Sequence, residues 1–372
     1  ERIFKEALST KLISALQKQD NFKTLHFTVF PLVGEGKEYQ KIHHQPVFKN
    51  PSFPSGGFIR SMKDLFHDIK AGLIQHHIRQ YATLSQLSKQ TDITLAVGDV
   101  FCLFLSASKN TSQTFFFPTA KSDAFMAHSF IERWMIRRLA NHIFTRDQLT
   151  CDAFKQALLP AYFFGNPMMD HLTPSAPPLR LPKNQKTIGI LPGSRSEAYG
   201  NFRLILNIVS QLPPLLPPPI FVVAKASSLE LEKLIRISTD MGWHLDSQSS
   251  NQHTTALMHT SKAQLFITSR FLNVLAQSHL IIGLSGTGNE QAVHVGKTVL
   301  CFPGTGPQST PLRFQEQRQL LGSQLIFINE TSPTYLAKKL NYHMLQAPKK
   351  PTYTSQKQCA SDAIAKKILS EL

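Results

Sequence analysis

The residue pattern best suited to chemistry is a short turn, ILPGSR, at the end of the apolar run Thr187–Leu191. Its last three residues are Gly193, Ser194 and Arg195. A glycine and a serine at the end of a strand, followed by a helix, present free backbone N–H groups to an anion, and an arginine adds a bidentate contact to phosphate. The same turn also occurs without a ligand, because such turns are common in parallel α/β folds.

A second turn, GLSGTGNEQA, begins at the end of the apolar run Leu280–Leu284. Its composition is that of a phosphate-binding turn, although neither the GxxxxGK[ST] nor the GxGxxG spacing is present. Glu290 falls in the expected first turn of the next helix, where it either accepts hydrogen bonds from ribose hydroxyls or balances the helix dipole. The small residues of this turn are Ser285, Gly286, Thr287 and Gly288.

A third glycine turn, PGTGPQ at 303–308, follows the next apolar run. Because the carboxyl ends of parallel strands meet at one edge of a sheet, the three turns are expected to border one crevice. The sequence therefore predicts a pocket for the phosphates of a nucleotide in the second half of the chain.

Charged side chains follow the apolar runs of the first half. Asp99 ends the segment VGD after the run Ile93–Val97, where an acid either caps the next helix or takes part in catalysis. Lys121 and Asp123 belong to the segment TAKSD, and Lys121 is a candidate partner for a phosphate or a carboxylate. A further turn, PSGGF, contributes Ser55, Gly56 and Gly57.

These turns need strands and helices to position them, and the sequence predicts an α/β fold with parallel sheets. Short continuous apolar runs alternate with helical periodicity, which is typical of strands buried on both faces. Glu230–Met241 and Pro311–Leu321 are predicted helices, the second ended by Gly322. The predicted strands are Leu25–Phe30, Ile93–Val97, Thr114–Phe117, His142–Thr145, Thr187–Leu191, Ile220–Val223, Gln264–Thr268, Leu280–Leu284, Thr298–Phe302 and Leu325–Ile328.

The 372 residues are enough for two such domains. The segment 173–186 is rich in proline and charge without periodicity, and it predicts a linker between domains over 1–172 and 187–354. A final helix over 355–372 is expected to return to the first domain. The chain begins in a helical pattern where an α/β domain normally opens with a strand, so we expect a first strand and its glycine turn to precede residue 1.

Composition and charge restrict the partners. An apolar content of 42% and a charged content of 17% fit a globular protein, and the net charge of +16 suggests an anionic partner. Nucleic acid is the least favoured of these, because the sequence shows no arginine-rich tract, RNP-type aromatic pattern or zinc finger. A phosphorylated substrate and an anionic membrane face fit better.

Several kinds of site are not indicated. The four cysteines form no CxxC pair, which argues against a zinc site or a disulfide framework and fits a reducing compartment. No DxD, HExxH or GxSxG motif occurs, so we expect no metal ion and no cofactor. No run approaches the length of about 18 to 20 apolar residues of a membrane span. A helix predicted over Phe58–Leu73 either packs in the core or contacts lipid through its apolar face and basic flanks.

In their order, these segments resemble the lipid-A-disaccharide synthases. ILPGSR (190–195) and LSGTGNEQA (284–292) are similar to the donor-domain motifs of that family, and FFGNPMMD (163–170) is similar to the GNP segment between its halves. The resemblance covers nearly the whole chain. A narrower group, the lipid-A-disaccharide synthase-related proteins, is similar in PSGGF, AVGD (96–99), PTAKSD (118–123) and FTRDQLT (144–150).

The resemblance implies a GT-B fold, which has two facing Rossmann-like domains with the active site in the cleft. It also implies an inverting, metal-independent transfer of a sugar from UDP to a lipid-linked or glycolipid acceptor at the cytoplasmic membrane face. Residues 193–195 are then expected to meet the diphosphate or uridine, and Ser285, Gly286 and Thr287 to line the same donor site. Asp99 falls near the essential acid of the family and becomes the candidate general base.

The chain departs from the synthases at one position. They carry a glutamate where this chain has Gln291, while Glu290 lies one residue earlier. One step along a helix turns a side chain by about 100°, so the sequence leaves open which of the two reaches the ribose. Two other functions of the fold also stay open: a UDP-sugar 2-epimerase, which needs no acceptor, and a non-catalytic protein that binds a nucleotide sugar or a membrane.

Overall fold

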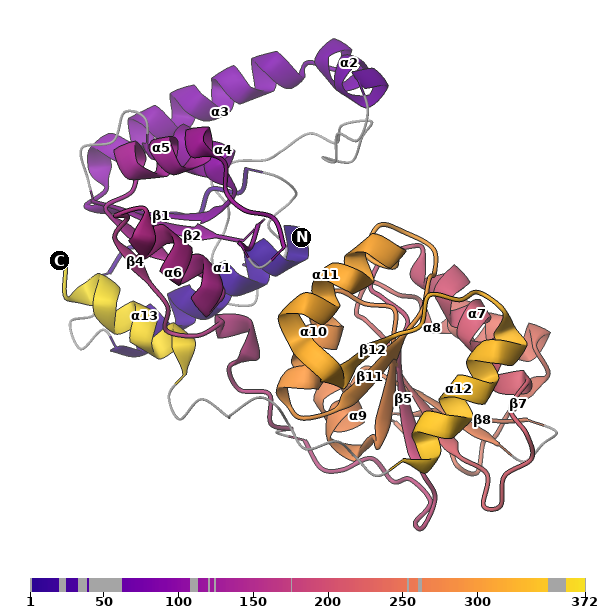
Figure 1. Cartoon of the computed structure of the whole chain (residues 1–372). Coiled ribbons are helices and arrows are strands. Elements are labelled where there is room, and N and C mark those ends of the chain that lie inside the picture. The colour runs from indigo at the N-terminus through magenta and orange to yellow at the C-terminus, as the bar shows by residue number, and fades with distance from the viewer. Residues whose placement is uncertain are drawn as a thin grey trace. The chain divides into compact units, whose positions relative to one another are not determined.

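The computed structural model describes residues 2–19, 25–32, 39, 62–107, 113–119, 121–123, 125–174, 176–252, 254–259, 263–346 and 359–371. The chain divides into two compact units (Figure 1). Unit 1 comprises Glu1–Asp170 and Gln356–Leu372, so both ends of the chain belong to it, and unit 2 comprises His171–Ser355.

Unit 1 is built on a four-stranded parallel sheet with the order β1-β2-β3-β4. Its strands are β1 (Ile93–Gly98), β2 (Gln113–Pro118), β3 (His142–Phe144) and β4 (Ala161–Tyr162). Its helices are α1 (Arg2–Gln19), α2 (Met62–Lys70), α3 (Leu73–Leu87), α4 (Val100–Ala107), α5 (Phe130–Leu139), α6 (Gln148–Gln156) and α13 (Ala360–Leu369), with short 3-10 helices at Ser88–Gln90 and Pro167–Met169.

Three consecutive phenylalanines show how this sheet is covered on both faces. Successive side chains of a strand point to opposite faces. Phe115 and Phe117 of β2 pack with α1 and α13, whereas Phe116 packs with α4, α5 and α6. The C-terminal helix α13 therefore completes the core of unit 1.

The segment FFGNPMMD joins α13 to this core. Asp170 accepts hydrogen bonds from the N–H groups of Ala360 and Ser361, both at 2.8 Å, and from the Ser361 hydroxyl at 2.6 Å. The Lys11 ammonium of α1 donates to the carbonyls of Pro167 and Asp170 at 2.9 Å. Burial lowers the pKa of Lys11, and the nearby Asp170 carboxylate partly opposes that shift.

Unit 2 is built on an eight-stranded sheet with the order β12-β11-β10-β5-β6-β9-β8-β7. The first six strands in this order are parallel, and β8 and β7 extend the sheet as antiparallel strands. The strands are β5 (Thr187–Leu191), β6 (Ile220–Ala224), β7 (Trp243–Leu245), β8 (Thr255–His259), β9 (Gln264–Thr268), β10 (Leu280–Gly283), β11 (Thr298–Cys301) and β12 (Leu325–Phe327).

Helices cover both faces of this sheet, with α7, α8 and α12 on one side and α9, α10 and α11 on the other (Figure 1). The helices are α7 (Ala198–Ser210), α8 (Leu231–Asp240), α9 (Phe271–Gln277), α10 (Thr287–His294), α11 (Pro311–Leu321) and α12 (Pro333–Leu345), with a 3-10 turn at Gly322–Gln324.

The segment predicted as a linker is bound to unit 2 where it passes α9. The amide of Gln277 exchanges two hydrogen bonds with the backbone of Leu179, at 2.7 and 3.0 Å, and Asn273 donates to the Pro177 carbonyl at 2.9 Å. Leu179 is buried in the core of the unit.

The strands predicted in the second half are confirmed within one residue, but two first-half predictions are wrong. Leu25–Phe30 contains only an isolated bridge at Val29. Its apolar side chains pack instead against the core beside α1, so burial rather than strand pairing explains the pattern. The helix predicted over Phe58–Leu73 is interrupted at Gly72, whose φ is +91°; residues 58–61 lie outside the described residues.

Candidate functional site

The glycine turns after β5 and β10 lie side by side in unit 2. β10 pairs with β5 on one side and with β11 on the other, and the Leu284 N–H continues the ladder to the Leu191 carbonyl at 2.9 Å. The chain runs from β5 to β6 and β9, then crosses to the other side of β5 to form β10. The two turns therefore flank the point where the strand order reverses, which is where open α/β sheets bind ligands.

Gly193 shows how close these turns approach each other. Its φ is +114°, a conformation that other residues rarely adopt, and a Cβ atom there would lie 3.5 Å from the Leu284 carbonyl oxygen. A side chain at position 193 would thus require a strained backbone, whereas 3.5 Å is an ordinary van der Waals distance. The glycine is needed for the geometry of the turn, whatever the turn binds.

A buried asparagine of α7 connects the β5 turn to the turn after β11. The Asn201 amide donates to the carbonyls of Pro192 and Thr305 at 3.1 and 3.2 Å and to the Ser309 hydroxyl at 3.4 Å. Its oxygen accepts from the Thr305 N–H at 2.7 Å. A Cβ atom on Gly304 would lie 2.6 Å from that oxygen, which explains the glycine there.

A second pair of buried amides holds the turn after β10. Gln317 of α11 donates to the carbonyls of Ser285 and Gly286 at 3.4 and 3.1 Å. Its oxygen accepts from Asn289, which also donates to the Gly283 carbonyl at 3.1 Å. All three glycine turns are therefore fixed by side chains behind them, and their backbone dipoles are held in place before a ligand arrives.

The start of α10 has the features of an anion site. Gly286 is its N-cap residue and contributes no side-chain cap. Within the described part of the chain, the N–H groups of Thr287 and Gly288 donate no hydrogen bond, which leaves them for a ligand. Ser194 and Arg195 stand at the neighbouring turn, exposed and half-buried respectively.

The two candidates for the ribose contact differ in burial. Glu290 is only 4% exposed, whereas the next residue, Gln291, is half-buried. Of the two, only Gln291 exposes enough of its side chain to contact a ligand. It occupies the position where the synthases carry glutamate.

In unit 1, Asp99 has a structural task. Its Oδ1 accepts a hydrogen bond from the Cys102 N–H at 2.9 Å, which caps the first turn of α4. Asp99 also lines a small pocket, about 30 Å³ in volume, at the carboxyl ends of β1 and β2. The other lining residues are Gly98, Val100, Phe116, Pro118, Lys121, His128 and Glu132.

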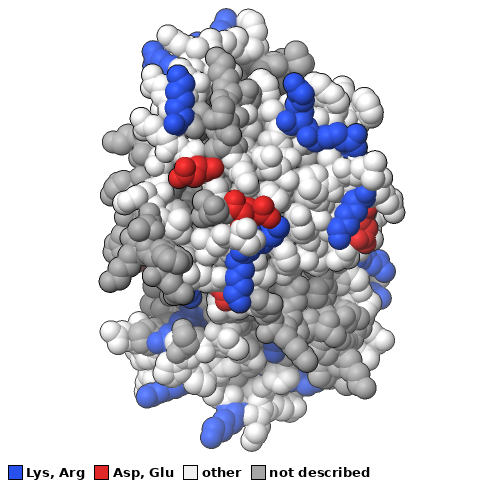
Figure 2. All heavy atoms as spheres, turned by 90° about the vertical axis from the view of Figure 1, so that its left-hand side faces the viewer, with Lys and Arg blue, Asp and Glu red and all other residues white. Residues whose placement is uncertain are grey.

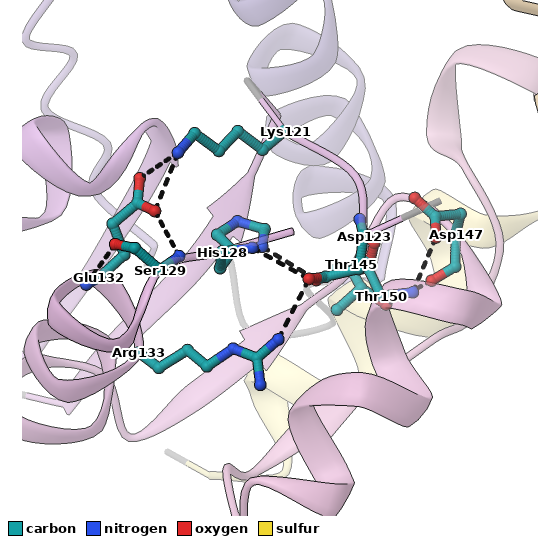
Figure 3. A network of polar contacts seen from close by, with 9 residues as sticks. All are labelled: Lys121, Asp123, His128, Ser129, Glu132, Arg133, Thr145, Asp147 and Thr150. Atoms are coloured by element: carbon teal, nitrogen blue, oxygen red, sulfur yellow. Dashed lines mark hydrogen bonds and ion pairs between the residues drawn. The ribbon is translucent and has the colours of Figure 1, made fainter. Parts of the chain in front are cut away.

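The predicted residue Asp123 is the centre of a polar network beside this pocket (Figure 3). Its Oδ2 lies 2.9 Å from Nδ1 of His128, and its Oδ1 accepts from the His128 N–H at 3.0 Å and from the Arg133 guanidinium at 3.3 Å. The Asp123 N–H donates to the Thr150 hydroxyl at 3.0 Å. The carboxylate is therefore held by His128 and Arg133, and the backbone of Asp123 is held by Thr150.

Lys121 also has a carboxylate partner, as the sequence suggests, and that partner belongs to the chain itself. Its ammonium lies 2.7 Å from one Glu132 oxygen and donates to the other at 2.9 Å. Glu132 forms a capping box with Ser129 at the start of α5. Burial raises the pKa of Glu132, but the hydrogen bonds from Lys121 and Ser129 outweigh it, so the pKa lies below its ordinary value.

Not every candidate residue can be placed. Ser55, Gly56 and Gly57 lie outside the described residues. Sequence reasoning missed His128, Asn201 and Gln317. The available signal for Asn201 and Gln317 was an uncharged polar residue on the inward face of a predicted helix, and for His128 only its place five residues after Asp123.

The helices that border the unit 1 pocket also expose large apolar side chains. Here the α4–α5 face denotes Phe101 and Phe104 of α4 and Phe130, Ile131 and Trp134 of α5. Phe130 is 83% exposed and Trp134 is 59% exposed. On the side of the molecule in Figure 2, lysines and arginines outnumber acids and stand apart, with uncharged surface between them.

The described residues include no helix that is both long and apolar enough to cross a membrane. They also contain no group of three or more His, Cys, Asp or Glu side chains arranged to hold a metal ion.

Comparison with known proteins gives structural similarity only. No protein-family model and no curated protein sequence matches the chain. Solved structures match over nearly its whole length. The UDP-GlcNAc 2-epimerase from Neisseria meningitidis, bound to UDP-GlcNAc, has a TM-score of 0.55 and 13% sequence identity, with 100% of this chain and 98% of that chain covered.

Two further solved structures agree with this match. The UDP-GlcNAc 2-epimerase from Methanocaldococcus jannaschii has a TM-score of 0.56 at 13% identity, covering 99% of this chain and 96% of its own. S. aureus MnaA with UDP has a TM-score of 0.56 at 14% identity, covering 99% and 94%. This chain therefore has the fold that the sequence predicts, GT-B with two Rossmann-like α/β units.

Proposed function

We propose that this chain is a UDP-sugar enzyme that breaks the bond between the anomeric carbon and the diphosphate and transfers the sugar, with inversion, to a lipid-linked or glycolipid acceptor. The observation that carries the proposal is the contact between the turns after β5 and β10 at the reversal of strand order. The motif resemblance to the lipid-A-disaccharide synthase-related proteins supports the finer assignment to a transferase.

The donor half of the proposal follows from the charge that develops in the reaction. The leaving diphosphate gathers negative charge as the glycosidic bond breaks. The N–H groups of Thr287 and Gly288 and the Arg195 guanidinium supply positive dipoles and charge, so no metal ion or cofactor enters the proposal. Gly193 and Ser194 keep the backbone of the other turn close to the phosphates, and Gln291 is proposed to contact the ribose.

The acceptor half rests on unit 1. Its pocket offers ionisable groups to an acceptor hydroxyl, and Asp99 is the candidate base from the motif resemblance. The α4–α5 face begins at this pocket, because Val100 and Glu132 of the same helices line it. An exposed aromatic surface with arginines on α5 suits the interface of an anionic membrane. We therefore propose peripheral binding at the cytoplasmic membrane face, where a lipid-linked acceptor would be found.

One alternative has its own support. The solved structures with TM-scores above 0.5 named above include UDP-GlcNAc 2-epimerases, and this fold similarity favours a UDP-sugar 2-epimerase over a transferase. The two activities share the donor site but differ in the acceptor. An epimerase converts the UDP-sugar to its 2-epimer without any acceptor.

Donor binding is tested by calorimetry with UDP. We expect Arg195→Ala to weaken UDP binding at least tenfold, while Arg203→Ala, which removes an exposed arginine of α7 paired with Asp240, leaves it unchanged. Absence of UDP binding by the wild-type chain, or equal affinity of wild type and Arg195→Ala, would remove the basis of the proposal.

Products then separate the activities. The wild-type chain is incubated with UDP-N-acetylglucosamine or UDP-diacylglucosamine, with and without an acylated glucosamine phosphate in phosphatidylglycerol vesicles. A transferase releases UDP only when the acceptor is present, whereas a 2-epimerase forms the 2-epimer in both conditions. UDP binding without either product would indicate a non-catalytic binding protein.

Membrane contact is tested by sedimentation with phosphatidylglycerol vesicles. The wild-type chain is expected to sediment with them, less so as salt rises. The double variant Phe130→Ser, Trp134→Ser is expected to stay in solution, while Tyr342→Ser, which changes an exposed aromatic residue of unit 2, behaves as wild type. Equal sedimentation of the double variant would contradict the assigned surface.

A further inference from the structure

The Asp123–His128 pair has the geometry of an oriented base. The side chains are 7% and 2% exposed, and Oδ2 of Asp123 lies 2.9 Å from Nδ1 of His128. An ionised carboxylate only accepts hydrogen bonds, so Nδ1 carries the proton and Nε2 of the neutral ring keeps its lone pair. The carboxylate thus determines which ring nitrogen is able to accept a proton.

That second nitrogen is available to the unit 1 pocket. His128 is one of the residues that line it, together with Asp99, Lys121 and Glu132. Figure 3 shows Nε2 turned away from Asp123, on the side of the network where Lys121 lies. Phe154 packs edge-on against the ring, with centroids 4.8 Å apart, and fixes its plane.

The other ionisable groups of the pocket are less suited to take a proton. Lys121 already carries a positive charge and is bound to Glu132. The hydrogen bonds to Glu132 that lower its pKa also weaken it as a base. Asp99 holds the first turn of α4 through the Cys102 N–H. The His128 imidazole, in contrast, is oriented by Asp123 and keeps a ring nitrogen that is able to accept a proton.

We propose that His128 is the general base of this pocket and that Asp123 positions it; the assignment rests on the proposed function. Nε2 of His128 accepts the proton of the acceptor hydroxyl while the oxygen of that hydroxyl forms the new bond to the anomeric carbon. The bond from that carbon to the diphosphate breaks, and its electron pair leaves with UDP. The imidazolium that forms is stabilised by the Asp123 carboxylate.

Other residues of the network then have defined tasks. Arg133 and the Thr150 hydroxyl hold Asp123, the first through the carboxylate and the second through the backbone N–H. Asp99 faces the same pocket and is assigned the role of orienting the acceptor hydroxyl. This division of roles predicts that variants of Asp99 and of His128 differ in how the rate depends on pH.

The test is the pH dependence of kcat/KM for UDP release with UDP-diacylglucosamine and the acylated glucosamine phosphate vesicles. His128→Asn is the informative variant, because its amide is able to keep the hydrogen bond to Asp123 while Nε2 is lost. For His128→Asn we expect a fall in kcat of at least a hundredfold and a UDP affinity within twofold of wild type. We also expect loss of the acid limb, which is the decline of kcat/KM toward acid pH between about pH 5 and 8.

Matched variants cover a failure to fold. His142→Asn changes another histidine of unit 1, on β3, and is expected to keep the acid limb. Asp123→Asn is expected to lower kcat and shift the limb without removing it, and Asp99→Asn to lower kcat while the limb stays. The charged groups around His128 are Asp123 and Arg133 on one side and Asp99, Lys121 and Glu132 on the other.

The outcomes separate the two proposals. If wild type turns over and His128→Asn retains kcat within threefold or keeps the acid limb, the assignment of His128 is wrong and the proposed function stands. If wild type binds no UDP or forms no product, the proposed function fails, and the assignment falls with it. Loss of both rate and limb in His128→Asn alone, with UDP affinity retained, supports the assignment.

Discussion

Replacement of Asn201 by alanine tests whether the glycine turns are held from behind. Asn201 is 1% exposed and makes hydrogen bonds to three residues of the β5 and β11 turns. The buried bonds to Pro192 and Ser309 contribute about 1 kcal/mol each, and those to the more exposed Thr305 about 0.5 kcal/mol each. We therefore expect Asn201→Ala to lower the free energy of unfolding of unit 2 by about 3 kcal/mol.

The two tryptophans allow unit 2 to be followed by itself. Trp243 of β7 is 2% exposed, so its emission shifts to the red when unit 2 unfolds, while Trp134 of α5 is already exposed in the folded state. In a Trp134→Phe background, urea unfolding monitored by fluorescence reports on Trp243 alone. The matched control is Asn207→Ala, the same change at a half-buried position of α7, expected within about 0.5 kcal/mol of wild type.

The same variant connects stability to binding. If Asn201 keeps the backbone N–H groups in place, the turns of Asn201→Ala are less ordered before UDP binds. Because binding must then order them, we expect the UDP affinity measured by calorimetry to fall at least tenfold. An unfolding midpoint and a UDP affinity equal to those of Asn207→Ala would show that the turns hold their geometry without the amide, and the reasoning would be refuted.

Three further predictions concern both units. Asp170→Ala removes the acceptors of the Ala360 and Ser361 N–H groups, so α13 is expected to become sensitive to limited proteolysis, with the unfolding free energy lowered by about 2 to 4 kcal/mol. The lowered pKa of Glu132 contributes stability that is complete above its unfolded value of 4.5 and is lost as pH falls through the folded value; Glu132→Gln should flatten urea midpoints measured from pH 6 to pH 3. Gln291→Ala should weaken UDP binding several-fold in calorimetry. It should weaken UMP binding by the same factor, since both nucleotides carry the ribose.

Much of the fold follows from the sequence because buried parallel strands are continuous apolar runs. β5 and β9 match their predicted bounds, and α11 begins and ends as its proline and glycine indicate. The failures have two causes. Leu25–Phe30 has the composition of a strand but only packs, and strand pairing depends on a neighbour that composition does not reveal. The antiparallel strands β7 and β8 were missed because they lack a continuous apolar run.

The turns of the proposed donor site were easier to recognise in the sequence than the pocket of the proposed acceptor site, because the two use different kinds of atoms. Backbone N–H groups bind phosphate only where small residues leave room, so Gly193 and the turn at 285–288 are visible as composition. The residues that hold these turns, Asn201 and Gln317, lie in helices. They hold the turns through hydrogen bonds that the sequence pattern does not reveal. Their contacts become visible only with coordinates.

The unit 1 pocket shows the converse case, in which side chains rather than backbone determine the chemistry. Asp99 is conspicuous in the sequence because it follows a strand, yet a carboxylate in that position has a helix to cap. His128 is inconspicuous, but burial, a carboxylate at 2.9 Å and an aromatic ring fix its tautomer and its plane. A base must be oriented and must keep a lone pair for the proton. By that criterion Asp99, which the sequence singled out, supports the site. His128, which the sequence passed over, is the residue positioned to take the proton.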